Sequence, residues 1–287
     1  MQELTRGYGL VEGPLWHAQH GLLFSDVLGG GVFSVSSAGE VSVVFPHRRG
    51  VGGMAVHQAG GLVVSGRNVS FKPFSGGPTQ VLLDRDEANG NVGYNDLTTD
   101  QKGRIYVGSL GASPVFADGR EPASGDLYMI DLDGSARQVA EDIRLTNGLG
   151  VSPDGNWLYH SDSALRTVLR YRVADNGDLG PKQDFAETSE GAPDGLAVAA
   201  DGSIWVALAG GHGVAGYSAD GALLELLKIP EPMCTSVCFG GEDLTDLFVV
   251  SGSDGMPGDQ AGAVYRCPAP TQGLELAFAQ TALPQVE

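Results

Sequence analysis

Positive charge is scarce in this sequence. Lys and Arg number 17 against 35 Asp and Glu, which gives a formal charge of −18. Nucleic acids and anionic membrane surfaces attract proteins through basic patches, so we expect neither as a partner. No apolar stretch is long enough for a membrane span or a signal peptide. We therefore expect a cytoplasmic protein, and nothing in the sequence calls for an obligate protein partner.

Cysteine is also rare, with three residues at Cys234, Cys238 and Cys267. A disulfide between the first two is conceivable, but the odd number and the strand-like surroundings favour ordinary thiols. Apolar residues at helical spacing are scarce as well, which argues against a helical fold.

Glycine, in contrast, is abundant, with 44 residues in 287, while charged residues make up only 18%. This composition is typical of many short strands joined by tight turns. Apolar residues at 42% are sufficient for a large core. We expect one all-β domain that covers residues 1–287.

A polar turn followed by a short apolar strand recurs six times along the chain. The first apolar residues of these strands are Leu22, Leu62, Ile105, Trp157, Ile204 and Leu247, separated by 40, 43, 52, 47 and 43 residues. Four strands need about 40–50 residues in one propeller blade. Each repeat continues with a second half of strand, turn and strand, which in the last repeat we expect at residues 262–278. The repeat predicts a six-bladed β-propeller, with the segment around residues 4–11 as an extra strand of the last blade.

Four oxygen-bearing residues occupy the same phase of the repeat, ten residues before the strand anchor. They are Glu12, Asn95, Asn147 and Asp194, and the second blade has Gly52 there. Residues that enter the innermost strands face the shared axis, so these side chains would converge on a central metal site. Carboxylate and amide oxygens suit Ca²⁺ better than Zn²⁺, which favours His and Cys. The alternative is turn chemistry, because Asn-Gly and Asp-Gly are common turn pairs.

The chain resembles the regucalcin/gluconolactonase/luciferin-regenerating enzyme family over nearly its full length. The resemblance is carried by five motifs in order: VEGPLWH at 11–17, GYNDLTTDQKGRIYVG at 93–108, LTNGLGVSPDGNWLYHSDS at 145–163, APDGLAVAADGSIWVA at 192–207 and TSVCFGGEDLTDLFVVSGSDGM at 235–256. The family implies a six-bladed propeller with a single divalent metal bound by Glu12, Asn147 and Asp194. The family pattern also implies that Asn95 binds the metal directly or lies next to it.

The resemblance implies a metal-dependent lactonase that opens a sugar aldonolactone or a related cyclic ester. The metal would polarise the lactone carbonyl, and Asp194 would act as general base toward water. Family members use Ca²⁺, Zn²⁺, Mn²⁺, Mg²⁺ or Fe²⁺, and the oxygen-rich ligand set leads us to expect Ca²⁺.

One position departs from the family pattern and concerns the substrate. Sugar lactonases similar to regucalcin have an Arg two residues before Asn95, whereas this chain has Gly93. Arg48 or Arg49 is a possible replacement, and Tyr94 a possible wall residue. We therefore expect Asn95, Tyr94 and Arg49 to contact substrate, with loops 46–52, 111–124 and 253–262 setting specificity.

Two other functions are compatible with the same residues. The first is a phosphotriesterase similar to diisopropylfluorophosphatase, in which a calcium ion polarises P=O and Asp194 is the nucleophile. The second is a propeller that binds metal or ligand without catalysis, because a fold does not determine a function.

Overall fold

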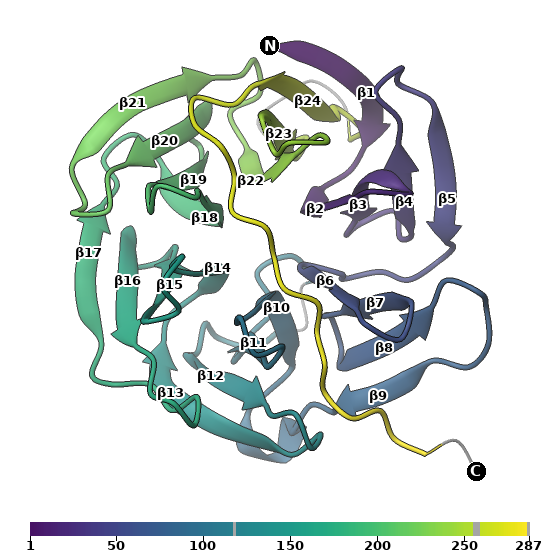
Figure 1. Cartoon of the computed structure of the whole chain (residues 1–287), viewed down its shortest axis with the longest axis vertical. Helices are drawn as coiled ribbons and strands as arrows, with labels where there is room; N and C mark the ends of the chain where they lie inside the picture. Colours follow the sequence, from purple (N-terminus) through teal and green to yellow (C-terminus); the bar gives the residue numbers. More distant parts are fainter. Residues whose placement is uncertain (117–118, 255–258, 286–287) are drawn as a thin grey trace.

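Each of the six sequence repeats contributes to a four-stranded antiparallel sheet in the computed structural model, which describes residues 1–116, 119–254 and 259–285. The sheets stand around a common centre as the blades of a propeller (Figure 1). The only helix in these residues is a single 3₁₀ turn, η1 (Glu87–Asn89). The prediction of an all-β, six-bladed propeller is confirmed.

Blades 1 to 5 follow the chain, and their strands run in order from the inner to the outer edge of each sheet. Blade 1 contains β2 (Val11–His17), β3 (Gly21–Asp26), β4 (Val32–Val35) and β5 (Val41–Phe45). Blade 2 contains β6 (Met54–His57), β7 (Gly61–Val64), β8 (Val69–Pro73) and β9 (Gln80–Leu83). Blade 3 contains β10 (Gly93–Thr99), β11 (Ile105–Leu110), β12 (Gly125–Ile130) and β13 (Ala136–Ile143). Blade 4 contains β14 (Thr146–Val151), β15 (Trp157–Asp162), β16 (Thr167–Arg172) and β17 (Gln183–Glu187). Blade 5 contains β18 (Ala192–Val198), β19 (Ile204–Ala209), β20 (Gly213–Tyr217) and β21 (Leu223–Lys228).

Blade 6 joins the two ends of the chain and closes the ring. Its inner strands are β22 (Cys234–Gly240), β23 (Asp246–Ser251) and β24 (Gly262–Pro268), and its outer strand is the N-terminal β1 (Gln2–Tyr8). An ion pair supports this closure, since Nη2 of the partly exposed Arg6 lies 2.7 Å from Oε1 of the fully buried Glu231. The Tyr265 hydroxyl donates to the other oxygen of Glu231 at 2.6 Å. The prediction of an N-terminal strand in the last blade is confirmed.

The C-terminal segment corrects the prediction of a strand at the end of residues 262–278. Because β1 already occupies the free edge of β24, residues 269–285 leave the blade and cross the centre of the ring (Figure 1). This strap is held by successive blades: the Leu274 amide donates to Val198 O, the Thr99 hydroxyl to Ala277 O, and the Ala279 amide to Val56 O. It therefore covers one end of the central channel.

The hydrophobic core is divided into six clusters, each between two adjacent blades. The largest fully buried side chain, Trp205, lies in the cluster between blades 5 and 6 with Val237 and Phe239. Each innermost strand packs against the innermost strands of both neighbouring blades, including β2 against β22. This ring of contacts gives the inner strands the fixed mutual positions that a site on the axis requires.

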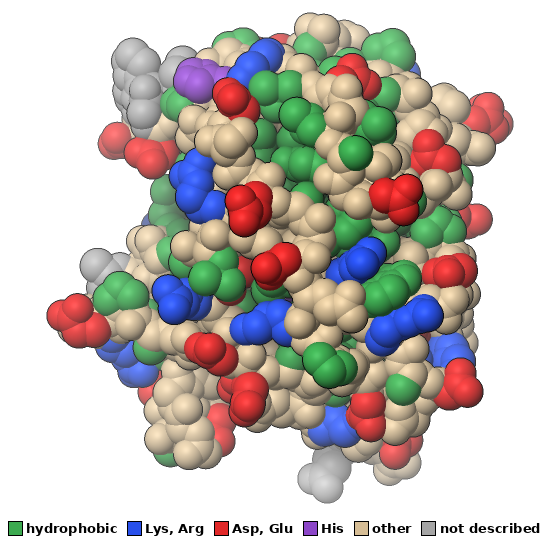
Figure 2. Space-filling view, turned by 90° about the vertical axis from the view of Figure 1, so that its left-hand side faces the viewer, with side chains coloured by type: hydrophobic (Ala, Val, Ile, Leu, Met, Phe, Trp, Pro, Cys, Tyr) green, Lys and Arg blue, Asp and Glu red, His purple; other side chains and the backbone are tan. Residues whose placement is uncertain are grey.

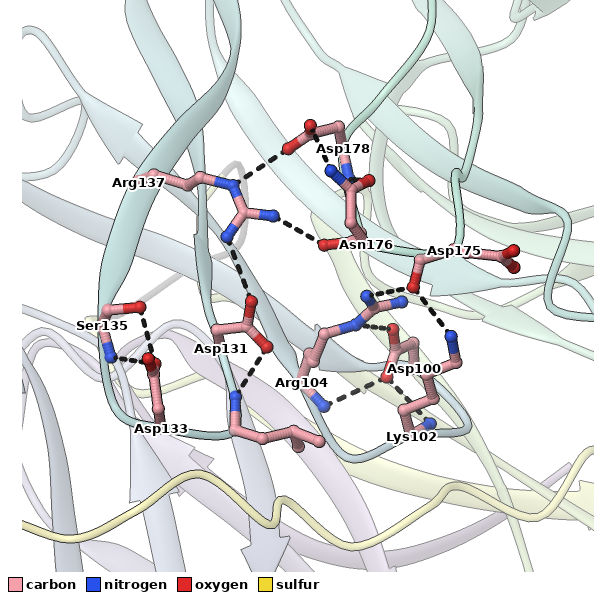
Figure 3. A network of polar contacts seen from close by, with 12 residues as sticks. Asp100, Lys102, Arg104, Asp131, Asp133, Ser135, Arg137, Asp175, Asn176 and Asp178 are labelled. Atoms are coloured by element: carbon pink, nitrogen blue, oxygen red, sulfur yellow. Dashed lines mark hydrogen bonds and ion pairs between the residues drawn. The ribbon is translucent and has the colours of Figure 1, made fainter.

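Polar contacts supplement the core between blades 3 and 4, on the turns at one face (Figure 3). Arg137 donates to Asp178 Oδ1 at 2.9 Å and to Asn176 O at 2.6 Å. Arg104 bonds Asp100 Oδ2 at 2.6 Å and Asp175 O at 3.0 Å. Both arginines bind a turn carbonyl of blade 4, and Arg137 also binds a carboxylate of that blade, so they stabilise the packing of blade 3 against blade 4.

Acidic and basic side chains are interspersed on the outer surface of blades 4 and 5, without a continuous basic area (Figure 2). No helix in the described residues is long and apolar enough to cross a membrane. All three cysteines are free, with Cys234 and Cys238 buried, as the sequence predicted.

Candidate metal centre

The four predicted ligands lie on four different innermost strands: Glu12 on β2, Asn95 on β10, Asn147 on β14 and Asp194 on β18. Each lies at or next to a β-bulge, where two residues of the inner strand face one residue of the neighbouring strand. The pairing shifts between Glu12 and Leu15 and, in the other three strands, across Asn95, Asn147 and Asp194 themselves. A bulge bends a strand and redirects its side chains, and bulges are frequent beside active sites. The shared phase in the sequence therefore reflects a bulge in the innermost strands of blades 1, 3, 4 and 5.

Glycine follows three of the four residues because the next blade comes very close there. A Cβ atom at Gly195 would overlap the Ser236 hydroxyl, and one at Gly148 would overlap the backbone of Leu196. Gly13 has a φ of +55°, which also favours glycine. The Asn-Gly and Asp-Gly pairs are thus explained by contacts between blades within strands. The turn interpretation of these pairs does not apply here.

The two asparagine side chains are joined in one buried hydrogen-bond network. Asn95 Nδ2 donates to Thr146 O at 2.9 Å and to Asn147 Oδ1. Asn147 Nδ2 in turn donates to Ser163 Oγ at 2.6 Å. The side chain of Asn95 also reaches Gly52, because its Oδ1 occupies the space that a Cβ atom would need there. The glycine at the same phase in blade 2 therefore leaves room for a site residue of blade 3.

Three carboxyl groups of the inner strands share a buried environment. Glu12 and Asp194 are only 8% and 4% exposed, and so is Asp96 at 8%, the residue after Asn95. Burial and the neighbouring carboxyl groups, Asp194 and Asp96, raise the pKa of Glu12 well above its usual value. Burial and the Asp96 charge raise the pKa of Asp194 in the same way. Burial raises the pKa of Asp96 to about 7.

Asp96 is the site residue that the sequence analysis missed. The repeat search compared one position in each blade, and Asp96 is one residue beyond that position. The bulge places both residues of the Asn95-Asp96 pair opposite a single residue of β11, so the side chains of both can contribute to the site on the axis. The signal in the sequence was a carboxylate where four other blades have glycine, at Gly13, Gly53, Gly148 and Gly195.

The arrangement of the carboxyl groups fits a divalent cation. Asp194 Oδ1 is buried and has no hydrogen-bond partner among the described residues. Like charges close together in a buried site are unfavourable unless they are protonated or neutralised by a cation. A dication beside Glu12 and Asp194 would reduce the repulsion among the carboxyl groups and give Asp194 Oδ1 a partner.

The donor set indicates which kind of cation fits. No group of three or more His, Cys, Asp or Glu side chains suited to hold a metal occurs in the part of the chain that the structure describes. A centre here must therefore use the amide oxygen of Asn147 as well as carboxylates. Such an oxygen-only set suits a hard cation such as Ca²⁺. The ligand assignment of Glu12, Asn95, Asn147 and Asp194 stays a prediction.

The residues predicted to contact substrate have different environments. Tyr94 is only 2% exposed and lies in the core between blades 2 and 3, where its hydroxyl donates to Asp84 O at 3.0 Å. It therefore does not form the channel wall that we expected. Arg48 binds Ser65 O and the backbone and side-chain oxygens of Asn68, at 3.1–3.2 Å. The Arg48 guanidinium is therefore bound to blade 2.

Arg49 remains available at the same face. It is exposed and has no side-chain hydrogen bond or ion pair with the described residues. Gly93 could not carry an arginine without a backbone shift, because a Cβ atom there would lie 2.9 Å from Gly66 O. Of the two arginines, only Arg49 is thus free to replace the missing guanidinium.

Loop 46–52 leads into β6 and loop 111–124 joins β11 to β12, both at the face away from the strap. Gly52 of the first loop contacts the side chain of Asn95. Phe116 of the longer loop approaches Gly50, with a ring atom 3.5 Å from the position of a Cβ atom there. Part of loop 111–124 and part of loop 253–262 fall outside the described residues.

A cavity of about 650 Å³ fills the channel on the other side of the site. Asp96 lines it together with Trp16 and Phe239, and the strap residues Leu274 and Phe278 border its far end. The cavity therefore reaches from Asp96 to the C-terminal strap.

The fold and the site together define the class of protein. It is a six-bladed propeller with buried carboxylates and amides around a polar centre on its axis. The sequence pattern of the family described as the SMP-30/Gluconolactonase/LRE-like region matches residues 10–253. The chain belongs to this family.

Named relatives agree with this assignment. A 6-deoxy-6-sulfogluconolactonase of Pseudomonas putida is 31% identical over 249 residues, which cover 84% of this chain and 83% of that protein. Regucalcin of Xenopus laevis is 29% identical over 279 residues, or 92% of each chain. The structure of a gluconolactonase from Xanthomonas campestris superposes with a TM-score of 0.79 at 26% identity, covering 93% of this chain and 89% of that one.

Proposed function

We propose that this protein hydrolyses a sugar lactone or a related small cyclic ester with one divalent cation, for which Ca²⁺ is the expected ion. The observation that carries the proposal is the buried, unpartnered Oδ1 of Asp194 beside two further carboxyl groups. Membership of a family with lactonases, two of which are named above, supports the choice of substrate class.

The residues would hold the cation in complementary ways. Glu12 and Asp194 supply negative charge, and Asn147 supplies a neutral oxygen that leaves the cation electrophilic. Asn95 stands beside Asn147 and donates to its oxygen. When bound, the cation supplies Lewis-acid polarisation of the ester carbonyl and stabilisation of the developing oxyanion.

Asp194 would move the proton in the reaction. Water attacks the carbonyl carbon, and Asp194 accepts a proton from that water as the new C–O bond forms. The ester bond to the ring oxygen then breaks, and the proton returns to that oxygen, so that lactone and water become one hydroxy acid. Asp194 must be ionised for this role, and its raised pKa falls when a positive charge lies nearby.

The test is a substrate panel on protein stripped of metal and reloaded with one ion at a time. We expect Ca²⁺ to restore hydrolysis of γ- or δ-aldonolactones, and we expect Asp194→Asn to abolish it in a protein that stays folded. Asp133→Asn, in an exposed turn, is the matched control and should keep full activity. Turnover of phosphotriesters in place of lactones would favour the phosphotriesterase alternative. Metal binding without turnover of either class would indicate a binding protein.

A further inference from the structure

We propose that Ser163 is a positioning residue that selects which end of the Asn147 amide faces the cation site. The inference rests on the proposed function, because it concerns a residue assigned there to the cation. Ser163 follows β15 and is itself buried, at 9% exposure, as is Asn147. It connects two blades: it accepts from Asn147 of blade 4 and donates to Pro193 O of blade 5 at 2.5 Å.

The direction of each hydrogen bond follows from the groups available. A backbone carbonyl such as Pro193 O only accepts, so the Ser163 hydroxyl must donate its single proton to it. Toward Asn147 the hydroxyl oxygen is then left as an acceptor. The amide atom that contacts Ser163 is therefore the nitrogen, and Oδ1 takes the opposite side.

The second contact of Asn147 supports the same orientation. Asn95 touches Thr146 O, another acceptor, so the contacting atom of Asn95 is also its amide nitrogen. That nitrogen donates to Asn147 Oδ1 as well. Both contacts of the Asn147 amide thus agree, and its oxygen is held on the side of Asn95.

This orientation matters because a cation accepts only one end of an amide. A metal ion binds Oδ1, whereas the NH₂ group would direct two protons at it. The amide torsion is soft, so the correct end must be chosen by the neighbours. Pro193 precedes Asp194, so Ser163 also ties Asn147 to the strand that carries the proposed base.

Ser161 provides a matched control. It lies on β15 two residues earlier, is fully buried, and its hydroxyl has no partner among the described residues. Ser161→Ala and Ser163→Ala remove the same atom from comparable depth. They differ in whether that atom holds Asn147.

The experiment measures the Ca²⁺ dissociation constant of the full-length, metal-stripped protein by calorimetry. Loss of a group that orients a metal ligand typically weakens affinity by roughly 10- to 100-fold, and we expect that loss in Ser163→Ala. Ser161→Ala should bind like the wild type. Thermal unfolding of each variant in chelator verifies that it is folded.

An Asn147→Asp background separates orientation from general support. A carboxylate presents oxygen at either end, so Ser163→Ala should cost little affinity in that background. If Ser163→Ala binds Ca²⁺ as the wild type does, or if it weakens both backgrounds equally, the role of Ser163 is wrong while the metal centre stands. If the wild type binds no divalent cation, the proposed function and this inference are both overturned.

Discussion

Replacing Asp96 by asparagine is expected to stabilise the metal-free protein at pH 8 and to leave its stability at pH 4 almost unchanged. No hydrogen bond or ion pair reaches the Asp96 carboxyl group from the described residues, so the substitution breaks no contact. It removes one of three buried carboxyl groups that repel one another, since the Asp96 charge acts on both Glu12 and Asp194.

The sign of the pH dependence follows from proton binding. Burial raises the pKa of Asp96 from 3.8 to about 7 in the folded protein. Between these values the folded state binds more protons than the unfolded state, so stability falls as the pH rises through this window. Well below pH 3.8 the carboxyl is protonated in both states and contributes nothing.

The magnitude follows from the same shift. A rise in the pKa of Asp96 from 3.8 to about 7 corresponds to about 4 kcal/mol of stability lost at high pH. Because Asp96 titrates together with the neighbouring carboxyl groups, we expect the substitution to recover roughly 2–4 kcal/mol at pH 8. For a domain of this size the midpoint of thermal unfolding should rise by roughly 5–10 °C.

The assay is thermal and urea unfolding in chelator between pH 4 and pH 8.5. Asp154→Asn is the control, because hydrogen bonds from Ser152 and Asn156 lower the pKa of Asp154 to about 2. That substitution removes the same charge but should reduce stability at neutral pH. An Asp96→Asn variant that is no more stable than the wild type at pH 8 would refute the electrostatic reasoning. A wild type that gains stability from pH 5 to pH 8 in chelator would argue against it as well.

Three further predictions concern the same molecule. Saturating Ca²⁺ should raise the unfolding midpoint more at pH 8 than at pH 5, since protons compete for the carboxyl groups; an equal rise at both pH values would place the ion elsewhere. Arg6→Ala should lower the free energy of unfolding, measured in urea, by roughly 2–3 kcal/mol, because it leaves the buried Glu231 with only Tyr265 as partner. Unchanged stability would show that the closure of blade 6 does not need this ion pair. Deleting residues 270–287 should lower the unfolding midpoint, because several backbone hydrogen bonds of about 1 kcal/mol each are lost. The deletion should leave the Ca²⁺ affinity unchanged, and weaker binding in calorimetry would mean that the strap supports the site.

The fold was predictable because propeller blades repeat. The anchors such as Leu22 and Ile105 all lie in the second strand of a blade, so their spacing reports the number of blades directly. The phase of Glu12 and Asp194 was predictable for the same reason, since both residues lie ten positions before the anchor of their blade and at or next to a bulge of the innermost strand.

Features that depend on contacts between blades were not predictable. The pattern GLELAF in residues 273–278 resembles a strand, but the edge that it would need is occupied by β1 from the other end of the chain. Tyr94 is next to Asn95 in the sequence, yet its ring turns outward toward Asp84 of blade 2. Ser163 contacts Asn147 and Pro193, which lie 16 and 30 residues away, and no local pattern marks it.

The central claim is that a divalent cation binds on the axis between Glu12, Asn147 and Asp194. The most direct measurement is a crystal structure of the protein soaked with Mn²⁺, with the ion located by its anomalous scattering. We predict a single strong peak within bonding distance of an oxygen of each of these three side chains. A peak elsewhere, or none at the axis with the ion in excess, would contradict the claim.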